Sequence, residues 1–364
     1  MGELVDALAV ALKAGLGFQA VFLALLAIGI NVQFGYTGLL NFGQIAFAML
    51  GGYGIAISVS QWGLDFWVGV AVGILAAVVL ALLLGLPTLR LRADYLAIAT
   101  IAAAEGLRLL FRSVSATPVT NGTRGLSGFN ADFVALAPWD TARRYGILGT
   151  QWSGAELWVT VVGWVLVALS CLLIWLLMRS PWGRVLKSIR EDEDAVRSLG
   201  KNVYVYKMQA LVLGGVLGAL GGMVYALGTA SANPDQYQNA NTFLAYAALI
   251  LGGAARVLGP VVGSMLMFFI IQFADTGLRT LIGNGVIPED LLSATDVAQL
   301  RFVLIGLGLM LLLVFRPQGI FGDRREVMLD ARCPEPRPAG LARRDGLLRR
   351  GPGRLRPGAR LADG

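Results

Sequence analysis

Five polar side chains interrupt apolar sequence between residues 31 and 44, and glycines at 35, 38 and 43 lie among them. If this region crosses a membrane, backbone groups freed by a loosened helix must be satisfied by protein or by a water-filled cavity. Broken helices of this kind border transport sites near the membrane centre. The pattern predicts a passage for a polar solute, and the alternative is a helix contact through small residues. The predicted pathway residues are Asn31, Gln33, Thr37, Asn41 and Gln44.

A second group of chemically active side chains lies in the apolar run 94–112. Glu105, Arg108 and Arg112 are spaced i, i+3 and i+7, which places them on one face of a helix. Burying an ionisable side chain in a membrane costs free energy, so such a residue is taken as a candidate functional residue. Glu105 is therefore added to the predicted pathway as a lining or gating residue, and the alternative is a structural Glu105–Arg108 pair.

The segment 179–207 is rich in charge and lies between two apolar runs. Pro181 favours a helix start and Gly200 a stop, and the apolar residues between them share one helical face. Such a helix either lies on lipid or docks in a groove of a cytoplasmic motor protein. The acidic block 191–194 disfavours contact with acidic lipid headgroups. The residues predicted to couple the chain to a motor are Arg184, Val185, Ile189, Arg190, Glu191, Asp192, Glu193, Val196 and Leu199.

The composition argues against several other classes of function. The chain contains no histidine, which removes His-based triads, His metal ligands and His proton relays. Its two cysteines, Cys171 and Cys333, suggest neither a disulfide framework nor a metal site. No P-loop motif occurs, so this chain does not itself bind ATP through a P-loop, and its energy source must lie elsewhere. An ion-coupled secondary transporter would need acidic or His relays, for which only Glu105 is a strong candidate. We expect no catalytic residues, metal or cofactor.

The elements that must position these residues are membrane helices. The chain has 364 residues, of which 56% are hydrophobic and 15% charged, against about 25% charged in soluble proteins. We predict an all-α polytopic membrane protein with eight to ten transmembrane helices, some broken or re-entrant, in a domain covering 1–322. The first apolar run is expected to be a span and not a removed signal peptide. The predicted spans are 10–32, 38–59, 64–89, 94–112, 156–178, 207–229, 243–256, 259–275 and 298–315.

Lysine and arginine predict the orientation in the bacterial cytoplasmic (inner) membrane. The basic segments 179–207 and 323–364 are expected in the cytoplasm, and 113–155 is expected outside as an external loop. With nine spans the N-terminus lies outside. The tail 323–364 combines proline, glycine and arginine with few apolar residues, which predicts a disordered cytoplasmic tail. From Arg316 onward twelve arginines and six acids account for +6 of the net charge of +7. The rest of the chain is therefore nearly neutral, which argues against binding nucleic acid.

Several motifs resemble one known family. Residues 35–47 (GYTGLLNFGQIAF), followed by GGYG at 51–54, look like the N-terminal signature of high-affinity branched-chain amino acid ABC permeases. Further matches occur in the same order along the chain, with Ala93 and Asn121 standing where many members carry glycine. They are 89–100 followed by Glu105, the external motif 120–126, the coupling loop from 183 to 207, residues 251–263 and residues 316–322.

The resemblance covers about 20–322 and implies an importer subunit that hydrolyses no ATP itself. The expected partners are two cytoplasmic ABC ATPase subunits, a second homologous permease, an extracytoplasmic binding protein and the lipid bilayer. Branched-chain amino acids are the expected cargo, and urea, short amides or other amino acids are the alternatives because related permeases carry them.

Overall fold

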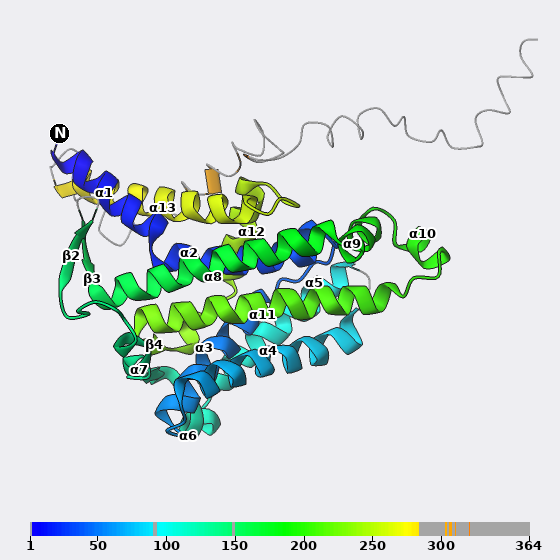
Figure 1. Ribbon diagram of the computed structural model, residues 1–364, viewed down its shortest axis with the longest axis horizontal. Coiled ribbons are helices and arrows are strands. Elements are labelled where there is room, and N and C mark those ends of the chain that lie inside the picture. The colour runs from blue at the N-terminus through cyan, green and yellow to red at the C-terminus, as the bar shows by residue number, and fades with distance from the viewer. Residues whose placement is uncertain are drawn as a thin grey trace, which may run out of the picture. The chain divides into compact units, whose positions relative to one another are not determined.

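The computed structural model describes residues 2–89, 93–147 and 150–283, together with positions 303, 306, 307, 310 and 320. Most of the predicted span 298–315 and the whole of the tail 323–364 lie outside the described residues. The described part is a bundle of long helices with a few short strands at one end (Figure 1). The prediction of an all-α polytopic protein is confirmed.

The long helices run back and forth along the longest axis of the bundle (Figure 1). Within the described residues, five helical segments are long and apolar enough to cross a membrane, and they include α2, α4, α8, α11 and α13. The principal helices are α1 (Gly2–Leu16), α2 (Phe18–Ile30), α3 (Gln44–Ser60), α4 (Phe66–Thr88), α5 (Ala93–Arg112), α8 (Gly154–Arg179), α9 (Pro181–Glu191), α10 (Glu193–Ser198), α11 (Val203–Thr229), α12 (Ala240–Gly252) and α13 (Gly259–Gly283).

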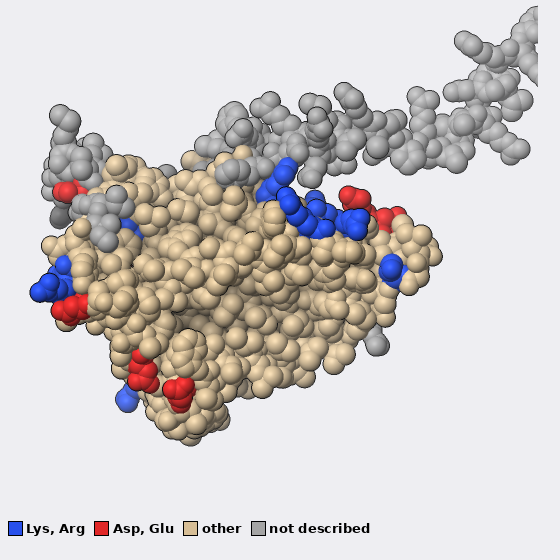
Figure 2. All heavy atoms as spheres, viewed as in Figure 1, with Lys and Arg blue, Asp and Glu red and all other residues tan. Residues whose placement is uncertain are grey.

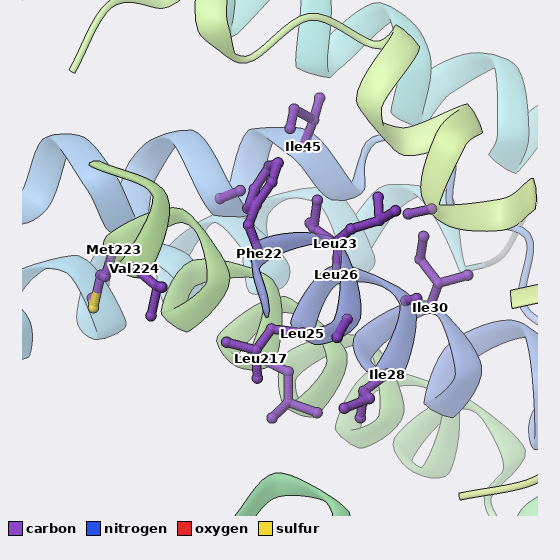
Figure 3. Packing of buried hydrophobic residues seen from close by; sticks show 14 of the residues in the cluster. Phe22, Leu23, Leu25, Leu26, Ile28, Ile30, Ile45, Leu217, Met223 and Val224 are labelled. Atoms are coloured by element: carbon purple, nitrogen blue, oxygen red, sulfur yellow. The ribbon is translucent and has the colours of Figure 1, made fainter. Parts of the chain in front are cut away.

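The centre of the bundle is built from α2, α3 and α11, whose apolar side chains interdigitate (Figure 3). Glycines allow these helices to approach closely. A Cβ atom at Gly222 of α11 would lie only 1.8 Å from the carbonyl oxygen of Ala48 in α3. About two turns away on α11, Gly214 faces Gly29 of α2. In lipid, where apolar surface gains nothing from leaving water, such close packing holds helices together.

The outer surface of the bundle is apolar. Large side chains of α4 and α8 are exposed, among them Leu75, Leu83, Val165 and Leu169. Figure 2 shows an uncharged surface between two groups of charged side chains at opposite ends of the bundle. An exposed apolar belt bounded by charge is the surface expected of a protein that sits in a bilayer.

Two helix boundaries differ from the prediction for identifiable local reasons. The predicted span 10–32 is two helices, because Gly17 adopts an extended conformation that ends α1 and starts α2. This break lets α1 pack beside α13. Helix α3 begins at Gln44 instead of residue 38, because the preceding loop is held in a non-helical form by side-chain hydrogen bonds. The predicted break between 243–256 and 259–275 is confirmed, although α13 continues to Gly283.

The predicted single helix from 181 to 199 is wrong, because the chain turns at Asp192. There the backbone is extended, and the Asp192 carboxylate accepts hydrogen bonds from the backbone N–H groups of Asp194 and Ala195 at 2.9 and 3.0 Å. An aspartate in this position is a strong N-cap. It starts a second helix, α10, in a new direction.

The segment 113–155 at the opposite end folds into short elements. Its strand β1 (Leu126–Ser127) pairs with β4 (Ser231–Ala232), and β2 (Arg144–Ile147) pairs with β3 (Thr150–Ser153), both antiparallel. The β1–β4 pair ties this segment to the link between α11 and α12. The short helices are α6 (Thr117–Thr120) and α7 (Ala131–Ala135), with 3₁₀ turns at Val114–Ala116, Gly122–Arg124 and Pro234–Gln236.

Candidate functional site

The polar run 31–44 forms a break between α2 and α3. Helix α2 ends in a π-helical turn, Asn31–Gly35, and the chain then loops through residues 36–43 before α3 starts. Gly38 in this loop has a φ of +73°, a value that glycine adopts without strain. The loop therefore depends on both its glycines and its polar side chains.

The amide side chains of the break form one hydrogen-bonded group. The Asn41 amide donates to Gln33 Oε1 at 2.9 Å and to Gln44 Oε1 at 3.2 Å. Gln33 and Gln44 in turn donate to the backbone carbonyls of Leu211 and Gly214 in α11, at 3.3 and 2.7 Å. The group thus fastens the interrupted chain to the central helix of the bundle.

A second break, between α12 and α13, lies against the first. The Asn31 side chain donates to the carbonyl of Arg256 at 2.8 Å and accepts from the backbone N–H of Ala255 at 2.9 Å. Ala255 has a φ of +59°, and Gly253 has a φ of +108°, so the α12–α13 link is sharply bent. One asparagine therefore satisfies a donor and an acceptor that the second break leaves without a helical partner.

Helix α12 covers the α2–α3 loop. The Tyr246 hydroxyl donates to the carbonyl of Asn41 at 2.9 Å, and the Thr242 hydroxyl accepts from the backbone N–H of Ile45 at 3.1 Å. The ring of Phe42 packs on the rings of Tyr246 and Phe243. Neither Thr242 nor Tyr246 was predicted, because single polar residues in an apolar run carry no sign of which distant segment they face.

The five residues predicted to line a pathway are gathered in one place but closed. Asn31, Gln33, Thr37, Asn41 and Gln44 are each at most 1% exposed. Thr37 also bonds internally, to the carbonyl of Val32 at 2.9 Å. In this conformation they satisfy backbone groups and each other, and their role in a pathway stays a prediction.

Glu105 lies apart from this cluster, in a group of charged side chains toward the C-terminal end of α5. Arg108 donates to both oxygens of Glu105 at 2.5–3.2 Å, so the predicted pair forms. Arg108 also bonds to Asp235 at 2.8 Å, and Arg112 lies 3.4 Å from the same carboxylate. The Asn239 amide donates to Glu105 at 3.3 Å. Asp235 and Asn239, which we did not predict, come from the link between α11 and α12.

Glu105 and Asp235 remain 38% and 40% exposed, whereas Arg108 is 13% exposed. Two carboxylates and two guanidinium groups alternate here, so the group is neutral overall and each charge has a partner. A partly exposed charged group on a membrane helix faces protein or water and not lipid. This charged group ties α5 to the α11–α12 link, and a role for Glu105 in gating stays a prediction.

The predicted coupling residues divide into buried and exposed sets. Ile189 and Val196 are 4% and 5% exposed and belong to the core of this chain, while Leu199 is 80% exposed. The shared apolar face that we predicted for Val185, Ile189, Val196 and Leu199 is therefore wrong, because the turn at Asp192 separates the two halves. The inner face of α9 also includes Leu186, which is fully buried.

The exposed coupling residues gather at one end of the bundle. They are Arg184, Arg190, Glu191, Asp192 and Leu199, and Figure 2 shows positive and negative side chains beside one another over α9 and α10. Glu193 is half-buried because it pairs with Lys207 of α11 and, at 2.9 Å, with Arg197. The pair with Lys207 anchors α10 to a central helix, whereas the pair with Arg197 lies within α10.

Membrane-length helices, paired helix breaks stabilised by buried amides and a charged two-helix segment at one end define a polytopic membrane protein with interrupted helices of the kind found in transporters. The sequence model of the family described as "Branched-chain amino acid transport system / permease component" matches residues 14–314. The chain belongs to this family.

Individual relatives agree with this assignment. The high-affinity branched-chain amino acid transport system permease protein LivM of Escherichia coli K12 is 29% identical over 305 residues, which cover 81% of this chain and 67% of LivM. A probable branched-chain amino acid transport permease LivM of Methanocaldococcus jannaschii is 23% identical over 340 residues, covering 82% and 90%. The autoinducer 2 import permease LsrC of Photorhabdus laumondii is 30% identical over 131 residues, covering 35% and 39%. No solved structure matches the chain.

Proposed function

We propose that this chain is the membrane-spanning subunit of an ATP-driven importer that takes up branched-chain amino acids. The observation that carries this proposal is the similarity to LivM permeases over about four-fifths of the chain. The cargo follows from the names of these relatives, and the need for an external energy source follows from the missing P-loop.

The proposed topology places α9 and α10 in the cytoplasm and the segment 113–155 outside. The basic residues of 179–207 support this orientation. The β1–β4 pair joins 113–155 to the α11–α12 link, and the Arg108–Asp235 ion pair joins α5 to the same link. Together they give a binding protein a folded surface on which to dock.

The proposed mechanism is alternating access around the two helix breaks. The buried amides of Gln33, Asn41 and Gln44 are neutral, and each can both donate and accept hydrogen bonds. They therefore suit a transient passage for a zwitterion more than a tight binding site. In the closed arrangement described above, their partners are the backbone of α11 and each other. In the open arrangement, water or solute takes over some of these bonds.

Two ATPase subunits and a second, homologous permease complete the proposed transporter. One ATPase docks on the exposed residues Arg184, Glu191, Asp192 and Leu199. Nucleotide binding in that partner shifts the permease between states only if the docked ATPase binds the two states with different affinity. Because α10 is anchored through Glu193 and Lys207, movement of the docked segment is transmitted to α11.

The test is uptake of radiolabelled leucine by cells that lack this chain, with and without the chain restored. We expect restored uptake that requires an active ATPase partner and that unlabelled isoleucine and valine suppress. Urea, short amides and unrelated amino acids serve as competitors. Suppression by one of these and not by isoleucine would refute the cargo and keep the transporter class. Uptake that persists with an inactive ATPase would refute the class.

A further inference from the structure

We infer that Arg190 is a positioning residue that links the cytoplasmic helix α9 to both helix breaks, so that movement of α9 is passed to the proposed pathway. This inference rests on the proposed function and adds the residue that carries the signal. Its basis is a run of short contacts from α9 to Gly35, from Gly35 to Asn31 and from Asn31 to the α12–α13 link.

The first contact joins α9 to the α2–α3 break. The Arg190 guanidinium donates to the carbonyl oxygen of Gly35 at 2.7 Å, across 155 residues of sequence. The Arg190 chain also lies beside Gly38, where a Cβ atom would be 3.5–3.8 Å from Arg190 atoms. On the preceding turn of α9, the Lys187 ammonium lies 5.9 Å from the centre of the Tyr36 ring. Two cations on one face of α9 thus contact neighbouring residues of the break.

The second contact joins the two breaks. A Cβ atom at Gly35 would lie 2.1 Å from Asn31 Oδ1 and 2.9 Å from the backbone nitrogen of Ala255. Gly35 therefore lies directly against the asparagine that bonds to Ala255 and Arg256. Because Gly35 packs directly on Asn31, a displacement of Gly35 toward this side chain is passed to the asparagine.

The electrostatics favour arginine at this place. Gly35 is the last residue of the π-helical turn, and its carbonyl is among those that the helix end leaves without an intrahelical partner. The end of a helix carries partial negative charge, which a cation stabilises. A hydrogen bond from a charged donor corresponds to a roughly 10- to 100-fold bias of an opening equilibrium. Loss of the Arg190–Gly35 hydrogen bond therefore weakens the coupling between movement of α9 and movement of the α2–α3 break.

The experiment uses the whole transporter in proteoliposomes and compares Arg190→Gln, Arg190→Lys and Arg197→Gln. Arg197 is the matched control, since it is an arginine of the same segment whose ion-pair partners, Glu193 and Asp194, both lie in α10. We expect Arg190→Gln to lower leucine transported per ATP hydrolysed roughly tenfold while ATP hydrolysis continues. Arg190→Lys, which keeps a cationic donor, should fall between, and Arg197→Gln should stay within about twofold of the unaltered chain.

An unchanged ratio in Arg190→Gln would overturn the inference. The ratio also stays unchanged when transport and hydrolysis fall in parallel, which is the result that a merely structural role predicts. Hydrogen–deuterium exchange tests the linkage independently of cargo. Residues 36–43 and 253–258 should exchange faster in Arg190→Gln than in Arg197→Gln. Unchanged exchange would overturn the linkage, whereas faster exchange with no ATP-driven leucine uptake even by the unaltered chain would refute the proposed function alone.

Discussion

Replacing Gly222 by alanine tests whether the close approach of α3 and α11 holds the bundle together. The added Cβ atom would lie 1.8 Å from the carbonyl oxygen of Ala48 and 2.4 Å from its carbonyl carbon. An ordinary contact requires 3.4 Å or more, so the two backbones must separate locally by about 1.6 Å. No side-chain rotation can relieve this overlap, because no χ rotation moves the Cβ of an alanine and the atoms it meets in Ala48 are backbone.

The cost follows from this displacement. A gap of 0.5–1 Å already forfeits about a quarter to a half of the attraction between contacting atoms. Gly51, whose Cβ would lie 2.1 Å from Ala219, shares the same interface and would lose its contact as well. Overpacking costs about 1–3 kcal/mol and sometimes more, so we expect destabilisation of about 3 kcal/mol or more.

The assay is thermal unfolding of the purified chain in detergent, followed by its size-exclusion profile and by the yield of folded protein. Gly106→Ala in α5 is the matched control, because a Cβ atom there meets nothing within 4 Å in the described structure. The control should be neutral or stabilised by about 1 kcal/mol, since alanine favours helix over glycine. Equal Tm values for the two variants would refute the reasoning.

Three further predictions concern the proposed transport function. Leu199→Asp should reduce ATP-driven uptake at unchanged yield of folded protein, whereas Ile189→Asp should reduce the yield itself because it places a charge in the core. Uptake and the yield after detergent extraction are measured for both variants, and the reverse pattern would contradict the docking surface. Glu105→Gln should change uptake and keep most of the folded yield, because Arg108 retains Asp235; a loss of yield alone would indicate a purely structural tie. Removal of 323–364 should leave uptake intact, and loss of transport in quantified membranes would show that the tail contributes.

The glycine and polar pattern of 31–44 correctly predicted an interrupted helix, because backbone groups freed in lipid must find partners in protein or water. It did not predict the partners of those groups. Asn31 reaches Ala255 and Arg256, more than 220 residues away, and nothing local to either segment encodes that contact. The same limit applies to Asp235, which completes the ion pairs of α5 from a distant link.

The α9–α10 segment shows how one local signal changes an interpretation made from periodicity. Helical spacing alone places Ile189 and Leu199 on one face, but the carboxylate of Asp192 starts a new helix between them. Ile189 then faces the core and Leu199 faces solvent. The acidic block that separates them was visible in the sequence, and its capping action was the signal that would have located the turn.

The residue pattern of this chain settles that it is a membrane bundle and where its helices are interrupted, since the cost of exposing polar backbone to lipid acts locally along the chain. Which interrupted segments meet, and which face of each helix is closed, depends on packing between residues distant in sequence. Contacts such as that of Gly222 with Ala48 exist only when whole helices are aligned, so the three-dimensional arrangement decides which of the suspected residues are buried and which remain free to bind a partner.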